Sequence, residues 1–218
     1  MSTFPGTPRL LKGGIVTLDP ASGAVRRVIA LQYNPDSVSR SLQVQGAGDG
    51  GDASEALRVK GPPVETIKLE IELDAADHLE FPDQNGITVA SGLAPQLAAL
   101  EIIVYPSTSR LEANNALAGR GVLEVVPMEA PLTLFVWSRN RVQPMRLTEL
   151  SVTEEAFDVA LNPIRAKVSL GMRVLTVTDL GFPHRGGGLY MAFQRQKEQL
   201  AALAPYGTLS NFGLGALP

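Results

Sequence analysis

Apolar and polar residues alternate along two long segments of the chain. Residues 64–74 read VETIKLEIELD, with Ile67, Leu69, Ile71 and Leu73 at every second position. Residues 163–178 alternate in the same way, with one set made of Ile164, Ala166, Val168, Leu170, Met172 and Val174 and the other of Arg165, Lys167, Ser169 and Arg173. A period of two puts each set on its own face of a β-strand. Both segments are therefore predicted to be antiparallel strands with one buried and one solvated face.

The segment before the second strand carries the matching half of a hairpin. Residues 142–157 are apolar at Met145 and Leu147 and then at Leu150 and Val152, so the phase of the alternation changes at Thr148-Glu149. One extra residue in a strand, a β-bulge, produces such a change of phase. Residues 142–157 and 163–178 are therefore predicted to form one long hairpin that turns between 158 and 163.

A third pattern occurs near the N-terminus, where the apolar run of residues 25–33 stops at Asn34-Pro35-Asp36 and resumes at Val38. Pro35 has no backbone N–H for a sheet, and it biases Asn34 toward extended dihedrals. Asn34 and Asp36 both favour turns because their side chains bond to nearby backbone groups. The pattern predicts a turn between two strands.

Shorter segments complete the predicted mainly β fold. Residues 131–138 are apolar on both faces and indicate a strand covered on both sides, and residues 121–127 are a further short strand candidate. Residues 91–105 place Leu93, Leu97 and Leu100 at helical spacing, with Ser91 as a candidate cap. The Gly- and Asp-rich residues 46–61 are predicted to be a flexible loop.

The C-terminal region has a different composition from the rest. Gly186, Gly187 and Gly188 are predicted to be a hinge, and a helix of about 15 residues starting at Leu189 follows them. An apolar extended tail completes the region. The predicted organisation is a β domain of residues 1–180 and an extension of residues 181–218.

The charge and composition of the chain exclude several classes of partner and site. The formal net charge is −3 and the sequence pI is about 5.5, so no global basic field favours nucleic acid. The chain has no cysteine, which excludes disulfides, thiol catalysis and thiolate metal sites. No apolar run approaches the length of a membrane span, and the first residues lack the apolar core of a signal peptide. We expect a protein that is cytoplasmic when made and does not insert into a membrane.

The residues that usually carry chemistry lack a catalytic arrangement. His78 lies in an acidic stretch that suits a solvated turn, and His184 lies in the Pro- and Gly-rich stretch before the C-terminal helix. The Gly-rich segment matches neither a phosphate-binding loop nor a dinucleotide fingerprint. Neighbouring carboxylates such as Glu70 and Glu72 lie on solvated strand faces, where water stabilises both charges. We expect no catalytic, cofactor or metal site, and no enzyme.

Four stretches in order resemble one known family. They are ALQYNPDSVSRSLQVQ, PPVETIKLEIELDA, PLTLFVWSRNRVQPMRLTELSVTEEAFD and LNPIRAKVSLGMRV, and they fall roughly within residues 25–178. They resemble the tube-like proteins of contractile injection systems, a family that includes LysM-type baseplate hub adaptors. The C-terminal residues contain no segment similar to a LysM module, so peptidoglycan binding is not implied.

The resemblance implies a structural role and a fold. It implies a β-barrel or sandwich of the phage tail-tube and type VI secretion tube type, with one packed helix, and closure into a homo-hexameric ring. The ring would lie in the baseplate hub, between the spike protein and the inner-tube protein, in a particle that is either released or kept in the cell. Arg165, Lys167 and Ser169 would then face a water-filled lumen and form rings of like charge. The tail side chains Leu209, Phe212, Leu214 and Leu217 would dock on a neighbour or another baseplate protein.

Two alternatives remain open at this point. The chain could be the bulk inner-tube protein of the same machine, although such proteins usually lack a helical C-terminal extension. It could also be a monomeric β-barrel that binds a ligand or acts as a small cofactor enzyme. A monomer that binds a small molecule would favour the latter.

Overall fold

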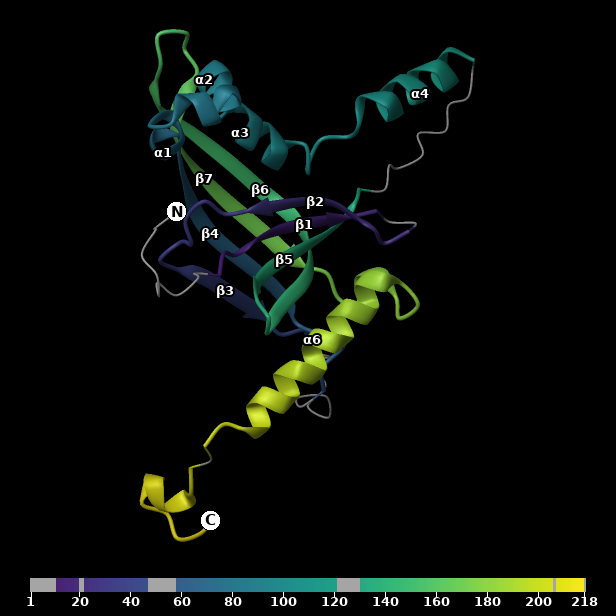
Figure 1. Ribbon diagram of the computed structural model, residues 1–218. Helices are drawn as coiled ribbons and strands as arrows, with labels where there is room; N and C mark the ends of the chain where they lie inside the picture. The colour runs from purple at the N-terminus through teal and green to yellow at the C-terminus, as the bar shows by residue number, and fades with distance from the viewer. Residues whose placement is uncertain (1–10, 20–21, 47–57, 121–129, 206, 218) are drawn as a thin grey trace.

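The computed structural model describes residues 11–19, 22–46, 58–120, 130–205 and 207–217. The fold is mainly β with packed helices (Figure 1), so the predicted fold class is confirmed. The strand predicted at 121–127 lies outside the described residues, as does most of the loop predicted at 46–61.

Within the described residues, seven strands form one antiparallel sheet in the order β2-β1-β5-β6-β7-β4-β3. The strands are β1 (Gly14–Leu18), β2 (Val25–Ala30), β3 (Val38–Gln43), β4 (Val64–Asp74), β5 (Leu132–Ser138), β6 (Arg141–Phe157) and β7 (Pro163–Val174). Strands β2, β1 and β5 lie across the group formed by β4, β7 and β6 (Figure 1). The sheet therefore curls over its own core.

The two strands predicted on either side of Asn34-Pro35-Asp36 are present but do not pair with each other. Strand β2 ends at Ala30 rather than at residue 33, and β2 and β3 lie at opposite edges of the sheet. The connection is fixed by side chains: Asn34 accepts a hydrogen bond from the N–H of Gly13, and its amide donates to the carbonyl of Leu11. Gln32 makes two hydrogen bonds with the backbone of Asp74 at the end of β4. The turn therefore carries the chain from one sheet edge to the other.

The long hairpin is confirmed. β6 and β7 pair from Met145↔Val174 to Phe157↔Pro163, and their register shifts between Leu147 and Glu149, where the sequence predicted a bulge. Gly171 lies opposite this bulge, where a Cβ atom would come within 2.9 Å of the Cβ of Glu149. β7 ends at Val174 instead of residue 178, because Thr176 and Asp179 form a capping box that starts a short helix, α5 (Val177–Leu180).

Some of the helices pack on the sheet, while α4 and η3 project away from it (Figure 1). The helices are α1 (Ala76–Leu79), η2 (Pro82–Gln84), α2 (Gly86–Ser91), α3 (Ala94–Glu101), α4 (Thr108–Gly119), α5, α6 (Arg185–Ala202) and η3 (Leu209–Phe212). The single helix predicted over 91–105 is wrong in its start, since Ser91 ends α2 and caps nothing. Gly92 breaks the helix with φ of +56°, a conformation that glycine adopts readily.

The core lies between the inner face of the curled sheet and these helices. The predicted inner set of β4 is buried, as are Ala166, Val168, Leu170, Met172 and Val174 of β7. Leu93, Leu97 and Leu100 join the same cluster from the α3 region, and Tyr190 joins it from α6. The two-residue period therefore placed the buried face of both strands correctly.

Candidate assembly surfaces

The outer face of β7 carries the residues assigned to a lumen. Arg165 and Ser169 are exposed and Lys167 is half-buried, so the three side chains alternate with the buried set as predicted. Arg165 Nε lies 3.1 Å from Asp74 Oδ2, and Lys167 Nζ lies 3.3 Å from Glu155 Oε1. Surface pairs of this kind contribute about 0–1 kcal/mol each. Their main effect is to neutralise the cations of the strand.

The neighbouring strands complete this face. Residues opposite one another in an antiparallel sheet point to the same side, so the register assigns the outer residues of β4, β7 and β6. Lys68 and Glu149 form a 3.7 Å ion pair across the side-chain-free position of Gly171. The face holds equal numbers of both signs: Lys68, Arg146, Arg165, Lys167 and Arg173 against Glu70, Glu72, Asp74, Glu149 and Glu155. The cations assigned to the lumen therefore share this face with an equal number of carboxylates, and their position in a lumen stays a prediction.

Within the described residues, β6 and β3 each have an edge that is not fully paired with another strand. β6 pairs with β5 only at residues 141–145, whereas its pairing with β7 continues to Phe157. Within the described part of the chain, residues 147–157 have no strand on their other side. β3 likewise pairs only with β4. The four strands β3, β4, β7 and β6 thus form a band with an unpaired edge on each side, which sequence patterns could not show.

The tip of the β6–β7 hairpin is ordered and apolar. The Asp158 carboxylate accepts hydrogen bonds from the backbone N–H groups of Ala160 and Asn162 and from the side-chain amide of Asn162. These bonds lower the pKa of Asp158, and the bond from the Asn162 side chain has the largest effect. Phe157, Val159 and Leu161 nevertheless remain exposed, with Val159 fully so. Apolar side chains held out by a rigid turn are suited to contact another molecule. Sequence reasoning treated this segment only as a turn.

The predicted glycine hinge is wrong. α6 begins at Arg185, and His184 caps it by accepting a hydrogen bond of 3.0 Å from the N–H of Gly186 at Nδ1. Gly186 and Gly187 are buried in the first helical turn. A Cβ on Gly187 would overlap the carbonyl oxygen of Gly181. The glycines let the helix start against the backbone of residues 181–182, which is a packing role rather than a hinge.

The tail beyond α6 exposes the four side chains assigned to docking. Leu209 and Leu214 are 39% and 42% exposed, and Phe212 and Leu217 are 78% and 71% exposed. Leu209–Phe212 form the short helix η3, which begins with a capping box at Thr208. The tail extends away from the sheet (Figure 1). Its docking on a partner stays a prediction.

Glu65 is a charged residue that is buried between the sheet and α6. Glu65, in β4, is 4% exposed and lies 3.5 Å from Arg40 and 4.0 Å from Lys197 Nζ, and Gln143 donates a hydrogen bond of 3.3 Å to it. The pKa of the Tyr190 hydroxyl on α6 is raised, mainly because the group is buried and secondly because the Glu65 carboxylate lies nearby. The contacts fasten α6 to the sheet. Sequence analysis missed this cluster, although Glu65 shares the inner phase of β4.

The two histidines lie in helical segments rather than in the turn and the hinge that the sequence predicted for them. His78 is exposed in the short helix α1, and His184 is the cap of α6. The described residues contain no group of three or more His, Cys, Asp or Glu side chains placed to hold a metal ion. None of the helices in the described ranges combines the length and apolar character needed to cross a membrane.

Comparison with known proteins gives a weak likeness to a solved structure. No protein-family model matches the chain, and no curated protein matches it. Among solved structures, it is similar to a chain from the tail of an empty GTA particle, a structure computed with helical refinement and C6 symmetry. The TM-score is 0.30 at 11% sequence identity, covering 75% of this chain and 90% of that chain.

Proposed function

We propose that this chain is a structural subunit of a contractile injection system, a phage-tail-like particle. Six copies form a ring in the baseplate hub that connects the spike to the inner tube, as the resemblance of its strands to the tube-like family implies. The observation that carries the proposal is the band of β3, β4, β7 and β6 with its two open edges.

Open edges of this length need partners. An exposed strand edge presents unpaired N–H and C=O groups that invite uncontrolled pairing. If β6 of one copy pairs with β3 of the next, each contact is head-to-tail, and the rotation closes a ring. Every edge of the band is then satisfied.

The size of such a ring follows from strand spacing. Six bands of four strands give a wall of 24 strands, and strands lie about 4.8 Å apart, so the circumference is about 115 Å before strand tilt. The corresponding diameter is about 37 Å between backbones. The outer faces of β4, β6 and β7 would line this channel with their balanced charges.

The role is structural rather than catalytic in this proposal. Several polar residues of the band form ion pairs along the strands. The C-terminal helix and tail favour the hub layer over the bulk tube. The bulk inner tube remains the second candidate, and a monomeric ligand-binding barrel is the third.

Engineered disulfides test the ring. Ser41 on β3 and Ser151 on β6 both lie on the outer face by register, and the chain has no natural cysteine. A Ser41→Cys, Ser151→Cys variant, with Thr153→Cys as a second position on β6, should give a covalent ladder that ends at six copies on oxidation. Cβ atoms of directly opposed, non-hydrogen-bonded residues lie about 4.5 Å apart, at the upper end of the range for a disulfide.

A matched control uses a surface outside the band. Ser109→Cys on α4 combined with Ser151→Cys should not give the ladder, since α4 buries none of its residues against the body. Native mass spectrometry of the unmodified chain, alone and with spike or tube proteins, gives the copy number directly. A chain that stays monomeric in every mixture would refute the ring.

A further inference from the structure

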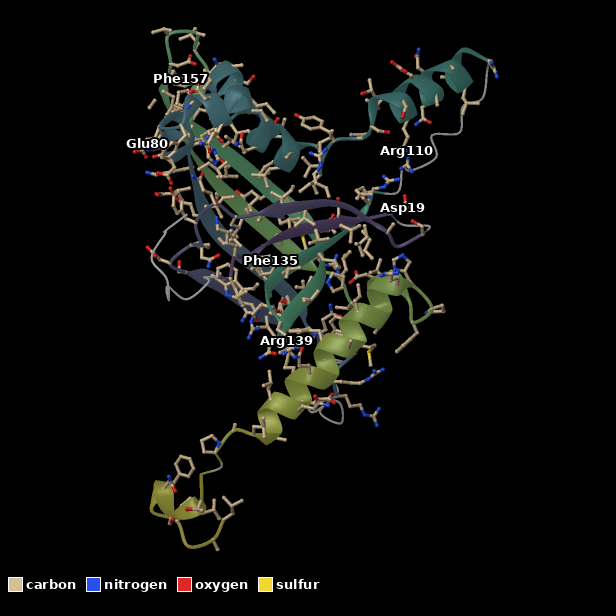
Figure 2. All side chains as sticks on the ribbon, viewed as in Figure 1. Asp19, Glu80, Arg110, Phe135, Arg139 and Phe157 are labelled. Atoms are coloured by element: carbon tan, nitrogen blue, oxygen red, sulfur yellow. The ribbon has the colours of Figure 1, made fainter. Side chains whose placement is uncertain are left out.

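The two ends of the curled sheet, taken along the direction of β4, β6 and β7, carry opposite net charge. At the end formed by α1, η2, α2 and the hairpin tip, residues 72–91 and 153–167 contain eight carboxylates, two cations and a neutral histidine. Its net charge is −6. Glu80 and Phe157 mark this acidic end in Figure 2. The two cations, Arg165 and Lys167, are already paired with Asp74 and Glu155.

Four segments converge at the opposite end. Gln196 of α6 donates a hydrogen bond of 3.0 Å to Asn140, which lies between β5 and β6, while Lys197 and Arg40 both approach Glu65. Residues 39–45, 58–66, 139–143 and 194–199 contain seven cations and two carboxylates, a net charge of +5. Arg139 marks this basic end in Figure 2. Burial first, and the nearby Arg40 second, lower the pKa of Arg141.

The overall net charge of −3 conceals this separation. β7 has 12 residues, and its first and last Cα atoms are eleven steps of about 3.3 Å, or about 36 Å, apart along the direction that joins the two ends. Charges at physiological ionic strength are screened over about 8 Å. The ends therefore do not neutralise each other, and each presents its own sign to a neighbouring molecule.

Each end also exposes apolar side chains beside its charges. The acidic end presents Phe157, Val159 and Leu161 on the rigid hairpin tip. The basic end presents Leu42, Val44 and Val59, which are 45%, 70% and 64% exposed. Residues 46 and 59 form a bridge that continues the β3–β4 pairing beyond Gln43, so these side chains lie at the same end as Arg40.

We propose that the acidic end of one copy docks on the basic end of a second copy of this chain, head to tail along the barrel axis. Both halves of the complementary pair, an acidic surface with a projecting apolar tip and a basic surface with exposed apolar side chains, occur on this one chain. Complementary potentials of this kind guide association and fix its orientation.

The inference deepens the proposed function and rests on it. If the band closes a ring, the axial contact stacks one ring on another, because a head-to-tail contact without rotation to closure repeats along its axis. The layer built by this chain then contains two or more rings. This holds for a hub made of stacked rings and for a bulk tube.

Charge exchange tests the stack. Glu80→Lys makes the acidic end less negative, and Arg139→Glu makes the basic end less positive; both residues are exposed. Either variant alone should form rings but should stack at least about tenfold less than the unmodified chain at 0.15 M salt, since the net charge of one end falls in magnitude by two units in each of the six copies. A mixture of the two variants should stack again, because each supplies the end that suits the other.

Controls separate the stack from the ring. Glu112→Lys on α4 makes the same change of net charge as Glu80→Lys outside both ends, and it should stack normally. Native mass spectrometry reports rings, while electron microscopy and sedimentation report stacks. Rings that never stack, or stacks that ignore the exchanged charges and salt between about 0.05 and 0.5 M, would overturn the inference and leave the ring intact. Absence of rings in all of these samples would instead refute the proposed function.

Discussion

Two adjacent glycines offer a matched test of how α6 is attached. Gly187 is buried, and an added Cβ would overlap the carbonyl oxygen of Gly181. Gly188 is exposed, and an added Cβ would have no atom within 4 Å. Neither residue has a positive φ angle, so alanine fits the backbone conformation at both. The same substitution should therefore have opposite effects one residue apart.

The magnitudes follow from two known costs. Alanine in place of glycine in a helix stabilises by about 0.5–1 kcal/mol, which is the expected gain for Gly188→Ala. Gly187→Ala has the same gain, but it forces the first turn of α6 away from the backbone at Gly181. Overpacking costs about 1–3 kcal/mol. The net destabilisation of Gly187→Ala should be about 1–2 kcal/mol, because backbone atoms cannot rotate aside as a flexible side chain would.

Thermal unfolding of both variants beside the unmodified chain measures the difference. For a chain of this size, 1 kcal/mol shifts Tm by about 2–4 °C. Gly188→Ala should raise Tm by about 1–4 °C, and Gly187→Ala should lower it by about 2–8 °C. If both variants were stabilised equally, the glycines would be a flexible linker, and the close packing of α6 on residues 181–182 would be wrong.

Three further predictions concern the faces of β7 and the tail. Val168→Asp should destabilise by several kcal/mol because it buries an unpaired carboxylate, while Ser169→Asp on the exposed face should change stability by less than about 0.5 kcal/mol; similar denaturation curves would contradict the assigned faces. A bulky thiol reagent should label Lys167→Cys in the free subunit but not in the assembled particle, and equal labelling would place residue 167 outside the channel. Deletion of residues 204–218 should leave Tm unchanged but prevent particle assembly, and normal particles would exclude a docking role for the tail.

The sequence predicted burial better than it predicted pairing. Ile71 and Val168 were placed in the core because a period of two is a local property of each strand. Whether β2 pairs with β3 depends instead on contacts between distant segments. Asn34 shows the limit, since its composition signals a turn but its bonds to residues 11 and 13 set where the chain goes. Local propensity therefore identified the strands and the turn but not the opposite sheet edges.

The glycine run shows a second limit. Three glycines in a row suggest flexibility when only the sequence is considered. In the structure, however, the backbone of Gly181 passes close to Gly187, and the Leu180 side chain leaves no room for a Cβ on Gly186. Close approach cannot be seen without the partner segment. Glu65, by contrast, left a signal, because it shares the phase of Ile67 and Leu69 on the buried face. A charge in phase with an apolar face indicates a buried polar contact.

Some features of the candidate assembly surfaces were visible in the sequence, and others depend on the fold. The alternation of Arg165 and Lys167 with buried residues was visible in sequence, but the carboxylates that neutralise them come from β4 and from the far strand of the hairpin. The open edge of β6 depends on where β5 stops pairing, and the charge of each end depends on which loops meet there. These features come from the fold as a whole, so patterns within single segments could not predict them.

The two proposed contacts differ in how they limit growth. A band that pairs edge to edge around a closed ring leaves no free edge, so the ring stops at a fixed number of copies. Docking of an acidic end on a basic end has no such limit, because every added copy exposes the same pair of ends again. Salt should weaken only the second contact strongly, since it depends on screened surface charges, whereas the first depends on backbone hydrogen bonds. A stack of defined length therefore requires a different molecule at one end, and residues 207–217 lie beyond the basic end (Figure 1).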